Sequence, residues 1–292
     1  MNSDSRNGNG HQHLVLRLSC ENKVGIVAAV AKLIADVEGN ILDSSQFDDR
    51  STGKFFMRTE FELVGEQGLP AFQNRFARDV AKPFDMFWSL HDKGEKVRAL
   101  VLVSKGDHCL EDLLYRSGKG TLPIEVTAVA SNHQSLRPNA QSRGIPFHYL
   151  PIVDGDKAAQ EAQVLGLMKE TGAELLILAR YMQILSPELC RQLRGRAINI
   201  HHSFLPGFKG AKPYHRAHDR GVKLIGATAH YVTEDLDEGP IIEQAVEPVS
   251  HRDYPEDLIA LGRDIESKVL SRAVRLHAEH RVFLNGIKTV VL

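Results

Sequence analysis

The sequence predicts an α/β protein with two domains: a βαββαβ sandwich of the ferredoxin-like type, then a Rossmann-like, mostly parallel open sheet. Three observations support this prediction. Residues 13–91 carry strand-like and helix-like apolar spacing in the order βαββαβ. Residues 92–96 form a charged linker that contains a glycine. In residues 97–292, apolar strands alternate with helical segments, which is typical of a parallel sheet covered on both faces.

The elements of the first domain follow from apolar spacing and turn residues. Residues 1–12 are polar and rich in glycine and asparagine, without the apolar segment of a signal peptide, so we expect a disordered tail. The pattern then predicts, in order, a strand at 13–19, a helix with Val27, Val30, Ala31 and Ile34 on its apolar face, strands at 41–47 and 55–63, a helix that Pro70 begins and Pro83 ends, and a strand at 86–90.

The second domain is predicted in the same way. The expected elements are strands at 97–103 and 124–130 with a helix at 107–116 between them, helices at 138–143 and 157–171, strands at 174–179, 197–200, 223–232 and 241–246, and a long helix at 255–283. In open sheets of this type the reactive site lies beyond the carboxyl ends of the strands, near the point where the strand order reverses. Asn199, Ile200 and His201 end one such strand, so we expect a site there.

Composition excludes several classes of function. Lys plus Arg (36) nearly balances Asp plus Glu (37), so there is no overall field that would attract nucleic acid or a membrane surface. No apolar run reaches the roughly 18 residues that cross a bilayer. The three cysteines are far apart and form no CxxC pair, so we expect neither a disulfide framework nor a structural zinc site. These features favour a cytoplasmic protein.

Asn199 and His201 are the first candidates for catalysis. They flank Ile200, so on an extended strand both side chains project to one face. An amide and an imidazolium placed together could both bind a carbonyl oxygen that gains negative charge, and the imidazole could also move a proton. The alternative for such a short motif is a loop anchored by hydrogen bonds.

An acidic loop, residues 233–240, follows a later strand. The simplest interpretation is a solvated turn. The functional interpretation is that one carboxylate turns inward, pairs with His201, raises the pKa of this histidine and orders an attacking water.

Three segments together resemble the folate-dependent formyltransferases. Residues 199–206 (NIHHSFLP) are similar to the N-I-H-x-S-x-L-P signature of that family, residues 233–240 to its T-x-x-L-D-x-G-P loop, and residues 179–185 to its A-x-x-M-x-I-L folate-binding segment. The resemblance implies that Asp237 is the inward carboxylate, and that Asn199, His201 and Asp237 are catalytic. It also implies a folate site, formed by Met182, Gln183, Ile184 and Leu185 with Thr233, Glu234 and Asp235 closing over it.

The first domain resembles the ACT domains, which sense small ligands in enzymes of amino-acid and one-carbon metabolism. Gly25 at the entry to the first helix, and Asn40 with Ile41 after it, carry this resemblance. Asn22 stands where these domains usually have aspartate. The resemblance implies an amino-acid effector bound near these four residues, with glycine or methionine as candidates, and a homo-oligomer. The alternative is a purely structural, oligomerising domain.

An ACT domain joined to a formyltransferase-type domain resembles the formyltetrahydrofolate deformylases. That implies hydrolysis of 10-formyltetrahydrofolate to tetrahydrofolate and formate, which feeds one-carbon and purine metabolism, with no cofactor and no metal. The turn at 104–109 supports hydrolysis, because Asp107 lies where a transferase would bind its substrate phosphate. The alternatives are a formyltransferase to glycinamide ribonucleotide or another amine, and a folate sensor without turnover.

Further histidines and a cysteine are weaker candidates. His202 is a candidate for positioning water, although strand alternation points it away from His201. His215 and His218 lie three apart on a predicted helix, and we expect a surface pair and not a metal site. His230 is expected to be a core or supporting residue. Cys109 begins a helix that would stabilise its thiolate, but packing is the simpler role.

Overall fold

A computed structural model describes residues 11–64, 68–205 and 213–292. The predicted tail, residues 1–12, lies outside the described part except for its last two residues, which already begin the first strand. The chain divides into two compact units. Unit 1 comprises residues up to Lys96 together with Glu279–Phe283 and Val290–Leu292, and unit 2 comprises Val97–Ala278 and Leu284–Thr289.

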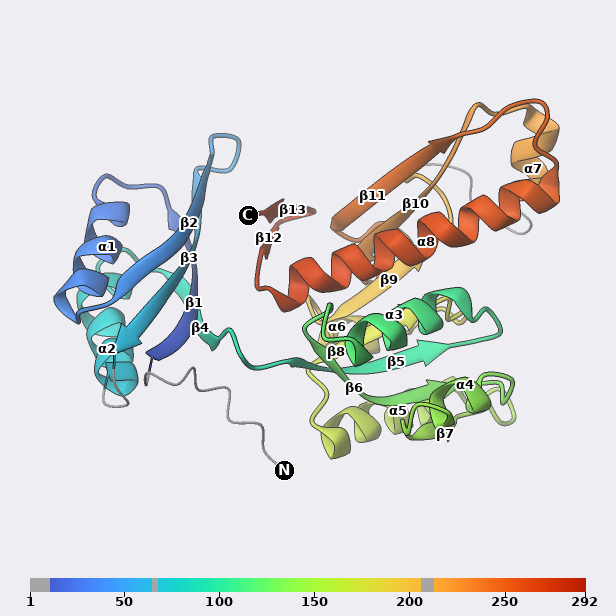
Figure 1. The fold of residues 1–292 in the computed structure, drawn as a ribbon, viewed down its shortest axis with the longest axis horizontal. Helices are drawn as coiled ribbons and strands as arrows, with labels where there is room; N and C mark the ends of the chain where they lie inside the picture. Colours follow the sequence, from blue (N-terminus) through green and yellow to red (C-terminus); the bar gives the residue numbers. More distant parts are fainter. Residues whose placement is uncertain (1–10, 65–67, 206–212) are drawn as a thin grey trace. The chain divides into compact units, whose positions relative to one another are not determined.

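Unit 1 is the predicted βαββαβ sandwich. Its antiparallel sheet has the order β2-β3-β1-β4. Its elements are β1 (His11–Glu21), α1 (Ile26–Asp36), β2 (Asn40–Asp49), β3 (Lys54–Val64), α2 (Gly68–Phe76) with a following π-helical turn, η1 (Ala77–Ala81), and β4 (Phe87–Asp92). Both helices lie on one side of the sheet (Figure 1). The apolar face of α1 differs slightly from the prediction, since Ile26 and Leu33 are buried whereas Val27 is exposed.

The second face of this sheet is also covered within unit 1. The sequence predicts a half-buried first strand, yet Val15 is as buried as Leu14 and Leu16. The cover comes from the end of the chain, where Phe283 packs edge-on against Phe56 with ring centroids 5.7 Å apart. The predicted helix 255–283 is therefore too long. It ends at Ala278, and Glu279–Phe283 directly after it belong to unit 1.

Unit 2 contains a seven-stranded sheet in the order β11-β10-β9-β8-β5-β6-β7. Its strands are β5 (Val97–Val103), β6 (Ile124–Ser131), β7 (Phe147–Tyr149), β8 (Leu175–Ala179), β9 (Ala197–His201), β10 (Leu224–Tyr231) and β11 (Ile241–Pro248). Neighbours from β9 to β7 are parallel, and β10 is antiparallel to both β9 and β11. The predicted Rossmann-like, mostly parallel open sheet is thus confirmed.

Helices cover both faces of this sheet. They are α3 (His108–Gly118), α4 (Arg137–Gln141), α5 (Lys157–Thr171), α6 (Pro187–Gln192), α7 (Pro213–Arg220) and α8 (Pro255–Ala278). Residues of α5 and α6 pack on Leu100, Leu102 and their neighbours in one core cluster. The long helix α8 runs along β9, β10 and β11 and lies beside α3 (Figure 1). A short hairpin, β12 (Val282–Asn285) and β13 (Lys288–Val291), follows α8.

The strand order places the site. From β5 the chain moves outward through β6 and β7, and it then returns to place β8 on the other side of β5. The segments that leave β5 and β8 therefore meet at the switch point, where the Met182 backbone N–H donates to Ser104 Oγ at 3.0 Å. Within the described part of the chain, no helix is long and apolar enough to cross a bilayer.

Candidate active site

A cavity of about 250 Å³ opens at the carboxyl ends of β8 and β9. Three chain segments line it: 178–185 after β8, 199–202 at the end of β9, and 230–237 after β10. It contains every residue predicted for catalysis, folate binding or water positioning, namely Met182, Gln183, Ile184, Leu185, Asn199, His201, His202, Thr233, Glu234, Asp235 and Asp237. Residues separated by more than fifty positions therefore converge on one cavity.

Asp237 faces His201 across this cavity. Asp237 Oδ2 lies 3.2 Å from His201 Nδ1, and both side chains are largely buried. The other loop residues 234–236 are exposed, so the carboxylate of Asp237 differs from its acidic neighbours. Its backbone has φ +59°, which turns the chain inward. Gly239 permits this turn, because a Cβ there would lie only 1.7 Å from the Tyr231 carbonyl oxygen.

His230 supports both Asn199 and Asp237. Its Nδ1 lies 2.9 Å from the Tyr231 carbonyl oxygen, so Nδ1 carries the proton and donates to that oxygen. Nε2 is then free to accept from Asn199 Nδ2 at 3.3 Å. Asp237 Oδ1 lies 3.8 Å from the same Nε2. His230 thus orients the amide of Asn199, which agrees with a supporting role.

The surroundings keep Asp237 ionised. Burial alone would raise its pKa, but the hydrogen bond from His201 Nδ1 outweighs burial and holds the pKa well below its ordinary value. His201 Nε2, on the far side of the ring from Asp237, is buried and has no hydrogen-bond partner among the described residues. The site therefore presents a fixed carboxylate together with an imidazole nitrogen that is left for a ligand.

His202 also belongs to this site, contrary to the alternation argument. Its ring stacks on that of His201 with centroids 4.7 Å apart and planes 24° apart. Strand alternation fails here because β9 ends at His201, so the next residue is no longer on an extended strand. Arg180 Nη1 lies 3.1 Å from His202 Nδ1. Burial lowers the pKa of His202 to about 4, and the positive charge of Arg180 adds to this shift.

Arg180 is the site residue that sequence reasoning missed. It follows β8 directly and lines the cavity, but only its neighbours in the segment 179–185 were singled out. Its backbone has φ +62°, a conformation that residues other than glycine rarely adopt. The available signal was a basic residue directly after a buried strand at the switch point.

A second cavity, of about 580 Å³, adjoins the first and shares Arg180, Met182 and Gln183 with it. Its wall includes the turn 104–108, with Asp107 exposed at the start of α3, and residues of α7 and α8. His133, His215 and Arg263 also line it. His215 and His218 both lie on α7, and His218 Nδ1 is 3.6 Å from the carboxylate of Asp219.

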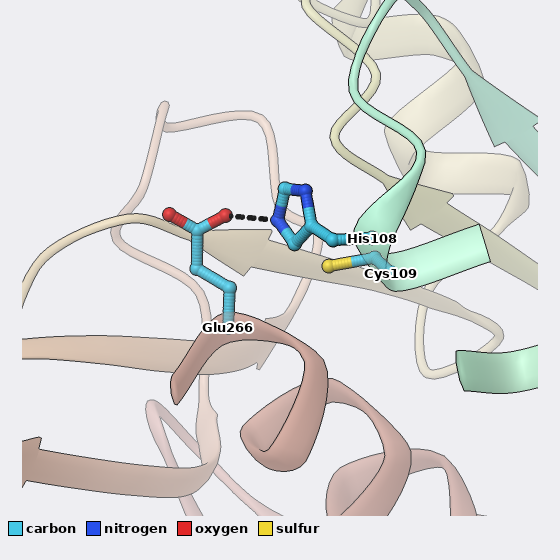
Figure 2. A group of neighbouring side chains, drawn as sticks. All are labelled: His108, Cys109 and Glu266. Carbon is cyan, nitrogen blue, oxygen red and sulfur yellow. Dashed lines mark hydrogen bonds and ion pairs between the residues drawn. The ribbon is translucent and has the colours of Figure 1, made fainter. Parts of the chain in front are cut away.

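Figure 2 shows a cluster of His108, Cys109 and Glu266, whose ligand-type atoms lie within 4.8 Å of one another. Of these three, His108 and Glu266 line the second cavity. His108 Nε2 is 2.7 Å from Glu266 Oε2, and Tyr214 donates to Glu266 Oε1 at 2.8 Å. Arg180 Nε lies 3.3 Å from Glu266 Oε2. A cation would have to compete with this arginine, so the cluster is better suited to anchoring Arg180; the prediction of no metal stays a prediction.

Cys109 in the same cluster is a packing residue, as expected. A helix N-terminus would stabilise a thiolate, but the side chain is fully buried. Burial raises the pKa of its thiol, and the negative charge of Glu266 raises it further. Desolvation thus outweighs the helix terminus at this residue.

The residues predicted for effector binding lie in unit 1. Gly25 precedes α1 with φ +96°, and Asn22 donates its backbone N–H to the Gly53 carbonyl at 2.9 Å. Asn40 and Ile41 begin the edge strand β2. All four residues are exposed. Effector binding at these residues stays a prediction.

The chain matches two family models and several named relatives. Residues 97–274 match the family model of formyl transferases, and residues 14–77 match that of ACT domains. The chain is 52% identical over 281 residues to a formyltetrahydrofolate deformylase of Corynebacterium sp., covering 95% of this chain and 97% of the relative. It is 46% identical to that of Bacillus subtilis over 288 residues, covering 98% of this chain and 95% of the relative.

Among solved structures, a deformylase is more similar to this chain than a transformylase is. The crystal structure of formyltetrahydrofolate deformylase from Burkholderia mallei has 51% identity and a TM-score of 0.91, and the match covers 96% of this chain and 99% of that chain. Glycinamide ribonucleotide transformylase 1 from Symbiobacterium toebii has 31% identity and a TM-score of 0.64, and the match covers 70% of this chain and 98% of that chain.

Proposed function

This chain belongs to the formyltetrahydrofolate deformylase family and hydrolyses the formyl group of formyltetrahydrofolate, and we propose that it acts on the 10-formyl isomer in the cavity at the ends of β8 and β9. The products are tetrahydrofolate and formate. The observation that carries this assignment is the pairing of Asp237 with His201 at 3.2 Å, beside Asn199, in one cavity.

We propose that His201 and Asn199 polarise the formyl group. In this scheme the His201 ring donates from Nδ1 to Asp237 Oδ2, and its Nε2–H donates to the formyl oxygen. The Asn199 amide, held by His230, donates its remaining N–H to the same oxygen. Donors placed in advance where negative charge develops stabilise the transition state, each by about 3 kcal/mol.

Water is the nucleophile in this scheme. Asp237 Oδ2 pairs with His201, and the other carboxylate oxygen, Oδ1, would accept a hydrogen bond from a water molecule. The water oxygen bonds to the formyl carbon while one water proton passes to the carboxylate. A tetrahedral intermediate forms, its carbon–N10 bond breaks, and N10 takes up that proton. Formate leaves, and its acidic proton goes to solvent, so that atoms and charge balance.

The folate itself would be held by the two segments that flank the reacting centre. Met182 and Ile184 line the cavity and are 61% and 59% exposed, so their apolar side chains are accessible to the planar face of a pterin ring. Backbone groups of 183–185 would provide hydrogen bonds to the ring. Thr233, Glu234 and Asp235 line the opposite side and would close over it.

The transferase alternative has less support. Glycinamide ribonucleotide transformylases match only 61–70% of this chain, at 28–33% identity. In this chain the turn after β5 places the exposed Asp107 carboxylate at the start of α3. A carboxylate repels the phosphate that such an acceptor would bring to the helix N-terminus.

Unit 1 would regulate or assemble the enzyme. We propose that it binds an amino-acid effector, with glycine or methionine as candidates, and that the chain forms homo-oligomers and works in the cytoplasm on one-carbon and purine metabolism. Edge strand β2 exposes Ile41, Leu42 and Phe47, which supports pairing of sheets between copies.

The test of this function is formate release without an acceptor. Purified protein is incubated with 10-formyltetrahydrofolate alone, and formate and tetrahydrofolate are measured over time. We expect equal amounts of both products at a rate that added glycinamide ribonucleotide does not change. Formate that is absent without an acceptor, with formyl transfer when an amine is added, would reject hydrolysis in favour of the transferase.

A further inference from the structure

Arg180 has a strained position between the two cavities of unit 2. It lines both of them, and its backbone has φ +62°. A non-glycine residue persists in this conformation only when its surroundings hold it there, and such residues concentrate at functional sites. The side-chain contacts of Arg180 therefore indicate which function this strained backbone conformation supports.

The guanidinium of Arg180 is held from the side of the second cavity. Its Nε lies 3.3 Å from Glu266 Oε2. Glu266 is itself buried and fixed by His108 at 2.7 Å and by Tyr214 at 2.8 Å. The guanidinium thus has a defined orientation before substrate binds.

The other end of the guanidinium determines the tautomer of His202. Arg180 Nη1 lies 3.1 Å from His202 Nδ1, and a guanidinium can only donate. His202 Nδ1 must therefore accept, which places the ring proton on Nε2. His202 Nε2 is buried and has no partner among the described residues.

His202 stays neutral in this environment. The groups that face it are Arg180, the stacked His201 ring, the Tyr214 ring, and the carboxylates of Glu266 and Asp237. Burial and the positive charge of Arg180 prevail over the two carboxylates, and they lower the pKa of His202 to about 4. At neutral pH its Nε2–H is therefore a permanent donor beside the reacting centre.

Resting on the proposed hydrolysis, we infer that Arg180 determines the choice of nucleophile, by holding His202 as an Nε2–H donor beside the reacting centre. Water has two lone pairs, so it can accept from His202 with one and attack the formyl carbon with the other. A neutral amine has one lone pair and cannot do both. Arg180 is in this sense a positioning residue that selects water.

Arg180→Gly is the decisive variant, because glycine suits φ +62° and removes the guanidinium that fixes His202. We expect turnover to formate to fall by about a hundredfold, as for other small misplacements of reacting groups. With glycinamide added as the amine, we expect N-formylglycinamide to become a measurable product, whereas the wild type forms formate alone. In that transfer the amine nitrogen bonds to the formyl carbon, the carbon–N10 bond breaks, and the amine proton passes to N10.

The spectroscopic readout is the ¹⁵N spectrum of the histidine rings, in which His202 is assigned from its absence in His202→Gln. We expect the Nε2–H tautomer in the wild type, the same tautomer in Arg180→Lys, and a mixture in Arg180→Gly. Asp154→Gly is the matched control, since Asp154 is also non-glycine with positive φ (+51°) but is exposed and lies outside both cavities. It should match the wild type in all readouts.

Two outcomes would overturn the inference: Arg180→Gly with an unchanged tautomer, or with an unchanged ratio of formate to N-formylglycinamide. Should Arg180→Gly not fold, His202→Gln and His202→Leu decide, because glutamine keeps an N–H donor and leucine does not. We expect only the leucine variant to form N-formylglycinamide, and equal behaviour of the two would reject the role. Wild-type protein that releases no formate would instead reject the proposed function.

Discussion

Each unit contains a stacked pair of histidines beside an arginine, and the two pairs differ in what their ring nitrogens contact. In unit 1, the rings of His91 and His280 lie 3.6 Å apart at 11°, and His91 Nε2 is 2.8 Å from Ser89 Oγ. In unit 2, His201 and His202 stack at 4.7 Å, and both Nε2 atoms are buried without a partner among the described residues.

The comparison separates a depressed pKa from a catalytic role. Burial lowers the pKa of both His91 and His202 to about 4, with Arg17 and Arg180 respectively adding to the shift. A perturbed histidine is therefore not sufficient to mark a site. What distinguishes the pair in unit 2 is that its unpartnered nitrogens lie in a cavity with a fixed carboxylate, Asp237.

Removing Asp237 should have the largest effect. In Asp237→Asn, the Nδ1–H of His201 loses its charged partner, and the water loses its proton acceptor. We expect turnover to fall about 10³-fold or more, since acid–base groups contribute 10²–10⁴-fold. Steady-state formate release measures this. Glu238→Gln, an exposed change in the same loop that lies outside the cavity lining, should stay within twofold of the wild type. A comparable loss in both variants would indicate a damaged loop and not a lost carboxylate.

The Asn199→Ala substitution should have the next largest effect on turnover. The loss of one donor to the developing oxyanion should lower turnover about a hundredfold, with little change in folate affinity. Asn139→Ala provides the matched control, because Asn139 Nδ2 donates to Glu111 Oε1 elsewhere in unit 2. Turnover is measured under saturating substrate and affinity by fluorescence titration. Full activity of Asn199→Ala would remove this residue from the mechanism.

The stability of the folded protein at acid pH allows a direct comparison of His91 and His202. The folded-state pKa of His91 and His202, about 4, lies below the ordinary value of 6.5, so the unfolded chain binds more protons between these two pH values. Stability that is complete above pH 6.5 is thus lost as pH falls towards 4. After allowance for partial exposure, we expect about 1–2 kcal/mol for each residue.

His91→Gln and His202→Gln test this expectation by urea unfolding at pH 7 and pH 5. Each variant should lose less stability than the wild type between the two pH values, and His91→Gln should leave formate release unchanged. A change of turnover in His91→Gln would break the distinction between the two pairs.

The smallest effect on activity is expected from chemical reaction at the cysteines. Cys20, Cys109 and Cys190 are all buried, and burial raises the pKa of each thiol. Native protein at pH 8 should therefore react with Ellman's reagent far more slowly than the urea-unfolded chain, and without loss of activity. Rapid reaction of one thiol in the native protein would show that burial does not control its reactivity.

The order of elements could be predicted from the sequence, because apolar runs such as 97–103 and amphipathic segments such as 108–118 carry a clear signal. The strand β7, with three residues, and the helix α6, with six, are too short to show a period. The predicted C-terminal helix was too long, because apolar residues continue beyond its true end through Val282 and Phe283. The break lies near His280, whose φ of +57° leaves no signature in composition.

The candidate site was predicted only in part, for related reasons. Asn199 and His201 lie on a strand, where alternation applies, and Asp237 lies in a recognisable loop. His202 lies one residue beyond the strand, where alternation no longer holds. The position of the Arg180 side chain depends on a positive φ and on contact with Glu266. Glu266 lies 86 positions away in the sequence and is close to Arg180 only in the folded protein.

The most direct test of the account is single-turnover hydrolysis of 10-formyltetrahydrofolate in H₂¹⁸O, with mass analysis of the formate. If water held by Asp237 attacks the formyl carbon, each formate should carry one ¹⁸O and one oxygen from the original formyl group. Formate without the label would contradict the account, because the bond to solvent oxygen on which the whole mechanism depends would not have formed.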